Sequence, residues 1–252
     1  MSDGIVHRLG LIAYEDAWRL QERLAAEIAA GKRPHTLLLL EHPHVYTFGR
    51  SGHGENLLWN AEELARRGLS VHWVDRGGDV TYHGPGQLVG YPLLRLTPVG
   101  REASRGSADP QRLKLDPLAY LRQLETVILR AVALFGVVAR RAPGLTGVWV
   151  KPAGRRSLAK LAAIGVKVDA HGVTRHGFAL NVAPDMTYWQ GIIACGLKGY
   201  AVTSLAALLG TPPPMTAVMD AIETAFGEVF GLQLRGERLD VEVSDVAGHA
   251  GS

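Results

Sequence analysis

The chain has 252 residues, enough to bury a large core as one domain or two small ones. Hydrophobic residues make up 47% and charged residues 20%, a globular composition with no apolar run long enough to span a bilayer. The single cysteine, Cys195, excludes an internal disulfide and a cysteine-rich zinc site. Residues 1–30 show no signal-peptide pattern, so we expect a cytoplasmic protein.

The charge of the chain leaves two classes of partner open. The formal net charge is +3, and the basic residues are scattered, with short clusters at 66–67, 140–141 and 151–160. A surface that binds nucleic acid would be basic. A surface that steers an acidic protein toward it would be basic as well.

Strands and helices are predicted in mixed order along the first half of the chain. Residues 14–30 carry apolar side chains at helical spacing and end at Gly31, while Asn60 can cap a short helix. Residues 80–83 and 87–94 are predicted to form the arms of a hairpin around residues 84–86. The remaining predicted elements here are strands at 5–12, 35–41 and 71–74 and a helix at 61–67.

The second half continues this mixed pattern after a polar loop at residues 97–114. Asp116 and Pro117 form an N-cap and N1 pair for a helix that extends to Phe135. Without strict βαβ alternation, the order favours an α+β fold with a mixed or mostly antiparallel sheet, in one domain over 1–240 with a tail at 241–252. The other predictions are strands at 137–140, 147–150, 160–168 and 172–182, a loop at 183–200, a short helix capped by Thr203 or Ser204, and a last helix from 211–214 to Phe230.

Residues 76–94 concentrate glycines within strand-like sequence. Glycine inside a strand marks a bulge, a bend or a close approach of the backbone to something else. The pattern therefore predicts either backbone folded around a bound molecule or a glycine-rich hairpin. The glycines are Gly77, Gly78, Gly84, Gly86 and Gly90.

Cys195 is the candidate nucleophile, because it lies in a glycine-flanked segment instead of an apolar helix or strand. A structural cysteine is the alternative. A reactive thiol needs a base or a nearby positive charge. The spacing does not choose among the candidates His83, His176, Lys160 and Lys167.

Other common sites have weak or absent signals. His42 and His44 suggest a metal site, but no further ligand follows at a matching spacing. The sequence contains neither a phosphate-binding loop of the Gly-x-x-x-x-Gly-Lys type nor a dinucleotide fingerprint opening a helix. We therefore predict no metal and no cofactor.

Several motifs in chain order resemble those of the lipoyl(octanoyl) transferases. The motifs are Glu-His-Pro-x-Val-Tyr-Thr-x-Gly at 41–49, Arg-Gly-Gly-Asp-Val-Thr-Tyr-His-Gly-Pro-Gly-Gln at 76–87, Lys-Leu-Ala-Ala-Ile-Gly at 160–165, His-Gly-Phe-Ala-Leu-Asn at 176–181, Cys-Gly at 195–196 and Thr-Ser at 203–204. The resemblance covers roughly residues 5–230 and implies the fold of the biotin and lipoate protein ligases, a mixed sheet flanked by helices.

The resemblance also implies an activity. Such enzymes move an octanoyl group from acyl carrier protein to a lysine of lipoyl domains in 2-oxoacid dehydrogenase complexes and the glycine cleavage H protein, the first step of endogenous lipoylation. The family's catalytic residues correspond to Cys195 and Lys160, with a Cys195 thioester as intermediate. Its acyl-binding positions correspond to Arg76, Gly77, Gly78, Asp79, Val80, Thr81, Tyr82, His83, Ala163, Ile164, Gly165, Gly177, Phe178 and Ala179. A monomer is expected.

Two positions beside the nucleophile depart from the family pattern. Ala194 stands where a proline is expected, and Leu197 where an aromatic or another aliphatic residue is common. Neither change removes a reacting group. The alternatives are an ATP-dependent lipoate or biotin protein ligase of the same fold, a cysteine hydrolase that releases the acyl group to water, and a basic nucleic-acid-binding module.

Overall fold

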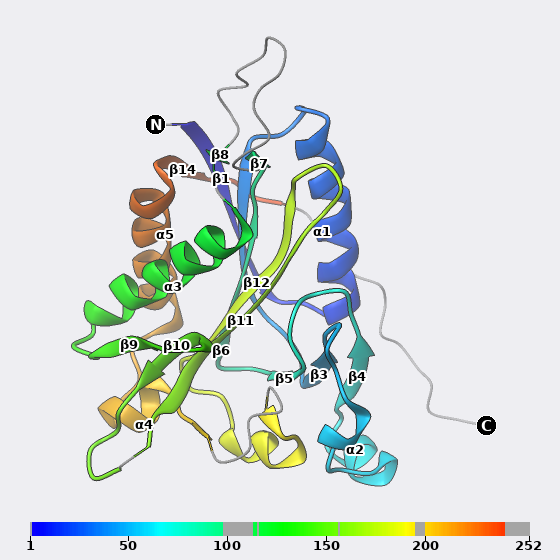
Figure 1. The fold of residues 1–252 in the computed structure, drawn as a ribbon, viewed down its shortest axis with the longest axis vertical. Helices are drawn as coiled ribbons and strands as arrows, with labels where there is room; N and C mark the ends of the chain where they lie inside the picture. Colours follow the sequence, from blue (N-terminus) through cyan, green and yellow to red (C-terminus); the bar gives the residue numbers. More distant parts are fainter. Residues whose placement is uncertain (1, 98–112, 115, 156, 195–199, 240–252) are drawn as a thin grey trace.

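The computed structural model describes residues 2–97, 113–114, 116–155, 157–194 and 200–239 (Figure 1). The helices are α1 (Tyr14–Ala29), α2 (Ala61–Arg66), α3 (Pro117–Ala133), α4 (Leu205–Leu209) and α5 (Met215–Phe230), with 3-10 turns at Gly54–Asn56 and Met186–Gly191. The strands are β1 (Ser2–Leu11), β2 (His35–Glu41), β3 (Val45–Phe48), β4 (Ser70–Trp73), β5 (Val80–His83), β6 (Gln87–Leu93), β7 (Leu96–Thr97), β8 (Leu113–Lys114), β9 (Ala139–Ala142), β10 (Leu145–Val150), β11 (Ala159–Val168), β12 (Thr174–Asn181), β13 (Ala201–Val202) and β14 (Leu232–Gly236).

A large mixed sheet forms the centre of the fold. Its strand order is β14-β1-β2-β6-β12-β11-β10-β9, and β13 pairs with β11 outside this path. Strands β14, β1 and β2 run parallel, whereas β2, β6, β12, β11, β10 and β9 pair antiparallel in succession. The predicted α+β fold with a mixed sheet flanked by helices is confirmed.

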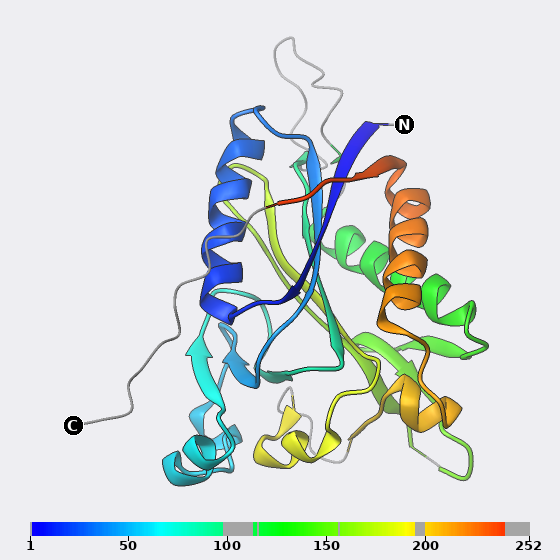
Figure 2. The ribbon, with the colours of Figure 1, turned by 180° about the vertical axis from the view of Figure 1, so that it is seen from behind.

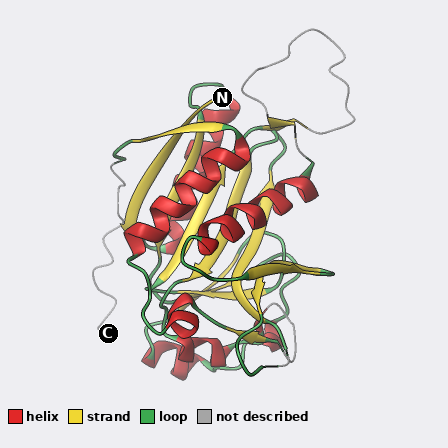
Figure 3. Cartoon of the chain, turned by 90° about the vertical axis from the view of Figure 1, so that its left-hand side faces the viewer, coloured by secondary structure: helices red, strands yellow, loops and turns green. Residues whose placement is uncertain are grey.

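Helices cover both faces of this sheet. Figures 1 and 2 show α1 on one side and α3 and α5 on the other, and Figure 3 shows two helices crossing the near face of the strands. The position of β2 between two cores explains its continuous run of apolar residues. Leu37 and Leu39 pack in one core, and Leu38 and Leu40 pack in the other. A strand that is covered on both faces cannot alternate polar with apolar residues.

The predicted hairpin at residues 80–94 is wrong. Strand β5 belongs to a separate three-stranded sheet, in the order β4-β3-β5, while β6 lies between β2 and β12 in the large sheet. The chain turns at Gly86, whose φ is +84°, and the Gly86 N–H donates to Glu41 Oε2 at 2.6 Å. The segment Gly84-Pro85-Gly86 therefore carries the backbone from the three-stranded sheet to the large sheet and does not form a hairpin turn.

The helix caps agree with the sequence, and several short elements were not predicted. Asn60, Asp116 and Ser204 each accept a hydrogen bond from a first-turn N–H of their helix. The predicted loop at 183–200 contains the 3-10 turn Met186–Gly191, and β14 follows α5 at the edge of the sheet without having been predicted. Most of the predicted loop at 97–114 and the whole tail at 241–252 lie outside the described residues.

Among the described residues, no helix is both long and apolar enough to cross a membrane.

Candidate active site

A strip of the large sheet without bulky side chains forms the floor of the site. Ala163 on β11 lies opposite Ala179 on β12, and Gly165 lies opposite Gly177. Alternate residues of a strand share a face, so these four small residues leave a hollow on the side of the sheet that α1 covers. A Cβ on Gly177 would overlap the main-chain oxygen of Gly90 on β6, so this position requires glycine.

The loop at residues 76–79 covers this hollow and is held by buried polar contacts. Arg76 donates to the carbonyl and hydroxyl oxygens of Thr47 on β3, and its Nη1 donates to Gly77 O at 2.9 Å. Asp79 accepts hydrogen bonds from the N–H of His53 at 3.1 Å and from Asn56 Nδ2 at 2.5 Å. These bonds fix the backbone of the loop over the strip of small residues.

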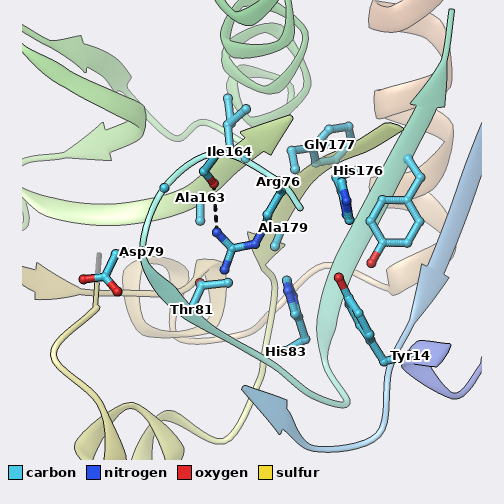
Figure 4. A pocket seen from close by; sticks show the side chains of 15 residues that line it. Tyr14, Arg76, Asp79, Thr81, His83, Ala163, Ile164, His176, Gly177 and Ala179 are labelled. Carbon is cyan, nitrogen blue, oxygen red and sulfur yellow. Dashed lines mark hydrogen bonds between the residues drawn. The ribbon is translucent and has the colours of Figure 1, made fainter. Parts of the chain in front are cut away.

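Floor and loop enclose a cavity with about 470 Å³ of space not filled by atoms, part of it open to solvent. Figure 4 shows Arg76 of the loop, Thr81 and His83 of β5, and Tyr14 at the start of α1 projecting toward this space. The lining residues are Tyr14, Arg76, Gly77, Gly78, Asp79, Thr81, His83, Tyr91, Ala163, Ile164, Gly165, His176, Gly177, Phe178 and Ala179.

The structure gathers the predicted acyl-binding positions at this cavity, with two exceptions. Val80 and Tyr82 are not among its lining residues, because they alternate with Thr81 and His83 along β5 and pack against Tyr46 in a separate core. The two-residue period of a strand thus divides the block 76–83 between the cavity and this separate core.

Tyr14 and Tyr91 also line the cavity, and sequence reasoning missed both. Tyr91 shares a face of β6 with Val89, which lies opposite Ala179, so it reaches the cavity through the pairing of β6 with β12, which the sequence did not predict. Tyr14 begins α1 and carries no local signal either, because its ring reaches the cavity through tertiary packing, stacked on the rings of His83 and His72.

Burial favours the neutral form of two histidines near the cavity, His42 and His83. Burial lowers the pKa of His42 to about 4 and holds the pKa of His83 well below its ordinary value. His42 Nδ1 donates to the Ile12 carbonyl and its Nε2 accepts from the Tyr91 hydroxyl, both at 2.8 Å. Both nitrogens of His42 are therefore occupied, and the part of the chain that the structure describes holds no group of three residues suited to a metal ion.

His176 and Lys167 belong to a cluster of polar side chains around Asp75, in which Lys167 forms an ion pair and His176 a hydrogen bond. His176 Nε2 lies 2.7 Å from Asp75 Oδ1, and Asp75 Oδ2 pairs with Lys167 and, at 2.9 Å, with Arg175. The hydrogen bond from His176 is the main cause of the lowered pKa of Asp75, while burial lowers the pKa of His176. His176 also has a φ of +57°, a left-handed conformation that tertiary contacts must support. Of the two, only His176 lines the cavity.

Lys160 lies at the start of β11, close to the chain that follows the candidate nucleophile. Its side chain is buried, and its Nζ is 4.8 Å from the centroid of the Trp149 ring. The ring of Tyr200, five residues after Cys195 in the sequence, lies 5.3 Å from the same tryptophan ring. Cys195 itself is outside the described residues.

The comparison with protein families decides where this chain belongs. Residues 13–227 match the model of the lipoyl protein ligase A/B catalytic domain. The chain belongs to this family. Proteins named octanoyltransferase are close in sequence: that of Chloroflexus aurantiacus is 45% identical over 93% of this chain and 97% of its own length, and that of Rubrobacter xylanophilus is 45% identical over 90% and 93%. The resemblance to octanoyltransferases, which are acyltransferases, is confirmed.

Solved structures of the family agree on the fold. A bipartite lipoate protein ligase of Thermoplasma acidophilum superposes with a TM-score of 0.67 at 15% identity, covering 95% of this chain and 88% of that one. A lipoate-protein ligase A bound with ATP superposes with a TM-score of 0.64 at 14% identity, covering 95% and 90%. Because the sequence identities are only 15% and 14%, these structural similarities establish the fold and nothing about function.

Proposed function

We propose that this protein transfers an octanoyl group from octanoyl-acyl carrier protein to a lysine side chain of a lipoyl domain, through a thioester on Cys195. The observation that carries the proposal is the cavity, whose floor of small residues Ala163, Gly165, Gly177 and Ala179 leaves room for an unbranched chain. The name shared by relatives at 45% identity over most of the chain supports the octanoyl group as the cargo.

The reaction needs no nucleotide. The Cys195 thiolate attacks the carbonyl carbon of the donor thioester, and the carrier leaves as a thiolate that takes a proton from Lys160. This exchange of one thioester for another has little net free-energy change. The lysine amine of the acceptor then attacks, the Cys195 thiolate leaves, and a stable amide forms, which drives the reaction forward.

Lys160 is proposed to serve both steps. A positive charge near Cys195 would favour the thiolate in the first step. In the second step, a Lys160 amine that has lost its proton could accept one from the incoming amine. The position of Lys160 against Trp149, next to Tyr200, supports this role because the segment from Cys195 to Tyr200 is short.

The partners follow from the reaction. The donor is octanoyl-acyl carrier protein, and the acceptors are lipoyl domains of 2-oxoacid dehydrogenase complexes and the glycine cleavage H protein. The Thermoplasma ligase of the same fold was described with its E2 lipoyl domain, which supports an acceptor of this kind. We further propose that residues 1–240 act as one catalytic domain, in a cytoplasmic monomer without metal or cofactor.

Amide formation without nucleotide tests the proposal. Octanoyl-acyl carrier protein and a lipoyl domain are mixed with the protein, and the mass of the lipoyl domain is followed with time. We expect the domain to gain one octanoyl group without ATP. A gain that requires ATP and free octanoate would instead identify an ATP-dependent ligase, and release of octanoate without a gain would identify a hydrolase.

A further inference from the structure

A continuous chain of side-chain hydrogen bonds runs beside the cavity and joins its covering loop to the strand that carries Lys160. The chain crosses from one sheet to the other, and each link connects residues distant in sequence or on different elements. Its members, in spatial order, are Arg76, Thr47, His83, Gln87, Asn181 and Thr203.

The polarity of this chain is set at one end by main-chain carbonyls. Asn181 Nδ2 donates to the Thr203 carbonyl at 3.0 Å, so Asn181 Oδ1 faces Gln87 and accepts from Gln87 Nε2 at 2.9 Å. Gln87 Nε2 also donates to the Tyr82 carbonyl at 3.0 Å, which uses both of its hydrogens. A carbonyl oxygen only accepts, so the orientation of both amides is fixed.

The orientation of the Gln87 amide decides which nitrogen of the His83 imidazole carries the hydrogen. Gln87 Oε1 lies 2.8 Å from His83 Nδ1, and since an amide oxygen cannot donate, Nδ1 must carry the hydrogen. His83 Nε2 is then a bare acceptor in the neutral ring.

The other end of the chain gives the same assignment. Arg76 has only donors, and its Nη2 donates to Thr47 Oγ1 at 2.9 Å. The hydroxyl hydrogen of Thr47 is thereby left to point at His83 Nε2, at 3.4 Å the longest link. All donors run in one direction, from a cation to a main-chain carbonyl, an arrangement in which successive bonds polarise one another.

The chain of hydrogen bonds ends at β11, the strand that carries Lys160. Thr203 accepts from Asn181 through its carbonyl, and its N–H donates to the Lys160 carbonyl at 2.9 Å. We propose that Gln87 is a positioning residue for acyl transfer, which holds His83 as the neutral Nδ1–H tautomer and ties the cavity wall at Arg76 to the backbone of Lys160. This inference rests on the proposed function for its effect on activity, but its geometry does not.

The assignment limits what His83 can do in the cavity. The neutral ring offers no N–H at Nε2 to a thioester carbonyl, and the lone pair of Nε2 already faces the Thr47 hydroxyl. The titratable groups around the ring are His42 and Tyr14, whose rings pack against it, His176, and Arg76, whose positive charge opposes protonation of the ring.

Nitrogen-15 NMR of the histidine rings tests the tautomer directly, because protonated and bare ring nitrogens have separate chemical shifts. The whole chain is labelled, and the signals of His83 are assigned by their loss in His83→Gln. We expect a protonated Nδ1 and a bare Nε2 that stay unchanged from pH 8 to about pH 6, which is below the ordinary histidine pKa of about 6.5. A protonated Nε2, or titration near pH 6.5, would overturn the proposal, and this reading needs neither an acyl substrate nor a folded variant at Gln87.

Gln87→Glu then separates positioning from stability. A carboxylate beside Nδ1 favours the imidazolium, so His83 should titrate at higher pH than in the unchanged protein, and the pH profile of octanoyl transfer should move with it. Transfer at the optimum should fall about tenfold, the lower end of the loss found when a group that orients a metal-binding histidine is removed. The control is Gln21→Glu. Gln21 is a buried amide that does not belong to the chain of hydrogen bonds, so this substitution should leave the tautomer of His83 unchanged. If the His83 signals and the pH profile are the same in Gln87→Glu and the unchanged protein, Gln87 does not position His83.

Discussion

Ala163→Val should shorten the acyl chain that the protein prefers. Ala163 lies on the cavity floor directly opposite Ala179, and valine suits a strand, so the substitution adds two carbon atoms to the cavity with little effect on β11. Burying a methylene is worth about 0.8 kcal/mol, so displacing two methylenes costs octanoyl about 1.6 kcal/mol, or about 15-fold. Hexanoyl, which is two methylenes shorter, should lose little.

The assay is competition between octanoyl and hexanoyl carrier protein for transfer to one lipoyl domain. The ratio of kcat/KM should fall from about 15 in the unchanged protein toward about 1 in Ala163→Val. Ala139→Val, on β9 and not among the residues that line the cavity, is the matched control and should keep the original ratio. If Ala163→Val slows both substrates equally and leaves the ratio unchanged, the cavity does not hold the acyl chain.

Three further outcomes follow from the structure. Gly177→Ala should lower the unfolding free energy in urea by about 1–3 kcal/mol because its Cβ meets the Gly90 carbonyl, whereas Gly77→Ala, whose nearest atom is 3.6 Å away, should change it little. Burial lowers the pKa of His42 from 6.5 to about 4, so between these pH values the unfolded protein binds a proton at His42 and the folded protein does not. The unfolding free energy should therefore fall by about 3 kcal/mol from pH 6.5 to pH 4. A His42→Asn variant should show a smaller fall, and an equal fall would contradict the lowered pKa of His42. Tyr14 lines both the cavity and a neighbouring groove, so Tyr14→Ala should join the two and raise the rate with decanoyl relative to octanoyl carrier protein; an unchanged ratio would mean that Tyr14 does not close the cavity.

The elements of the fold were largely predictable because their signals are local. Helical spacing and a glycine end marked α1, and Asp116 followed by Pro117 marked the start of α3. The pairing of strands was not predictable in the same way. Residues 80–83 and 87–94 have the local signature of a hairpin, and only the competing partners β3 and β12 place them in different sheets.

The residues of the site also fall into those with a local signal in the sequence and those placed only by tertiary contacts. The resemblance to the octanoyltransferases pointed to the small residues of β11 and β12 and to most of the block 76–83, since each lies in a contiguous motif, although Val80 and Tyr82 do not line the cavity. Tyr14 could not be found in this way, because its ring reaches the cavity only once α1 packs on the large sheet. The roles of His83, His176 and Lys167 also stayed open in the sequence, since a salt bridge to Asp75 and a hydrogen bond to Gln87 depend on tertiary contacts.

The central claim is that the octanoyl group passes through a covalent bond to Cys195. The protein is incubated with octanoyl-acyl carrier protein without nucleotide and without a lipoyl domain, then analysed by intact mass and by mass mapping of its peptides. We predict one added octanoyl group on the peptide that contains Cys195, slower labelling in Lys160→Ala, and none in Cys195→Ser. Transfer to a lipoyl domain that proceeds unimpaired in Cys195→Ser would contradict the account.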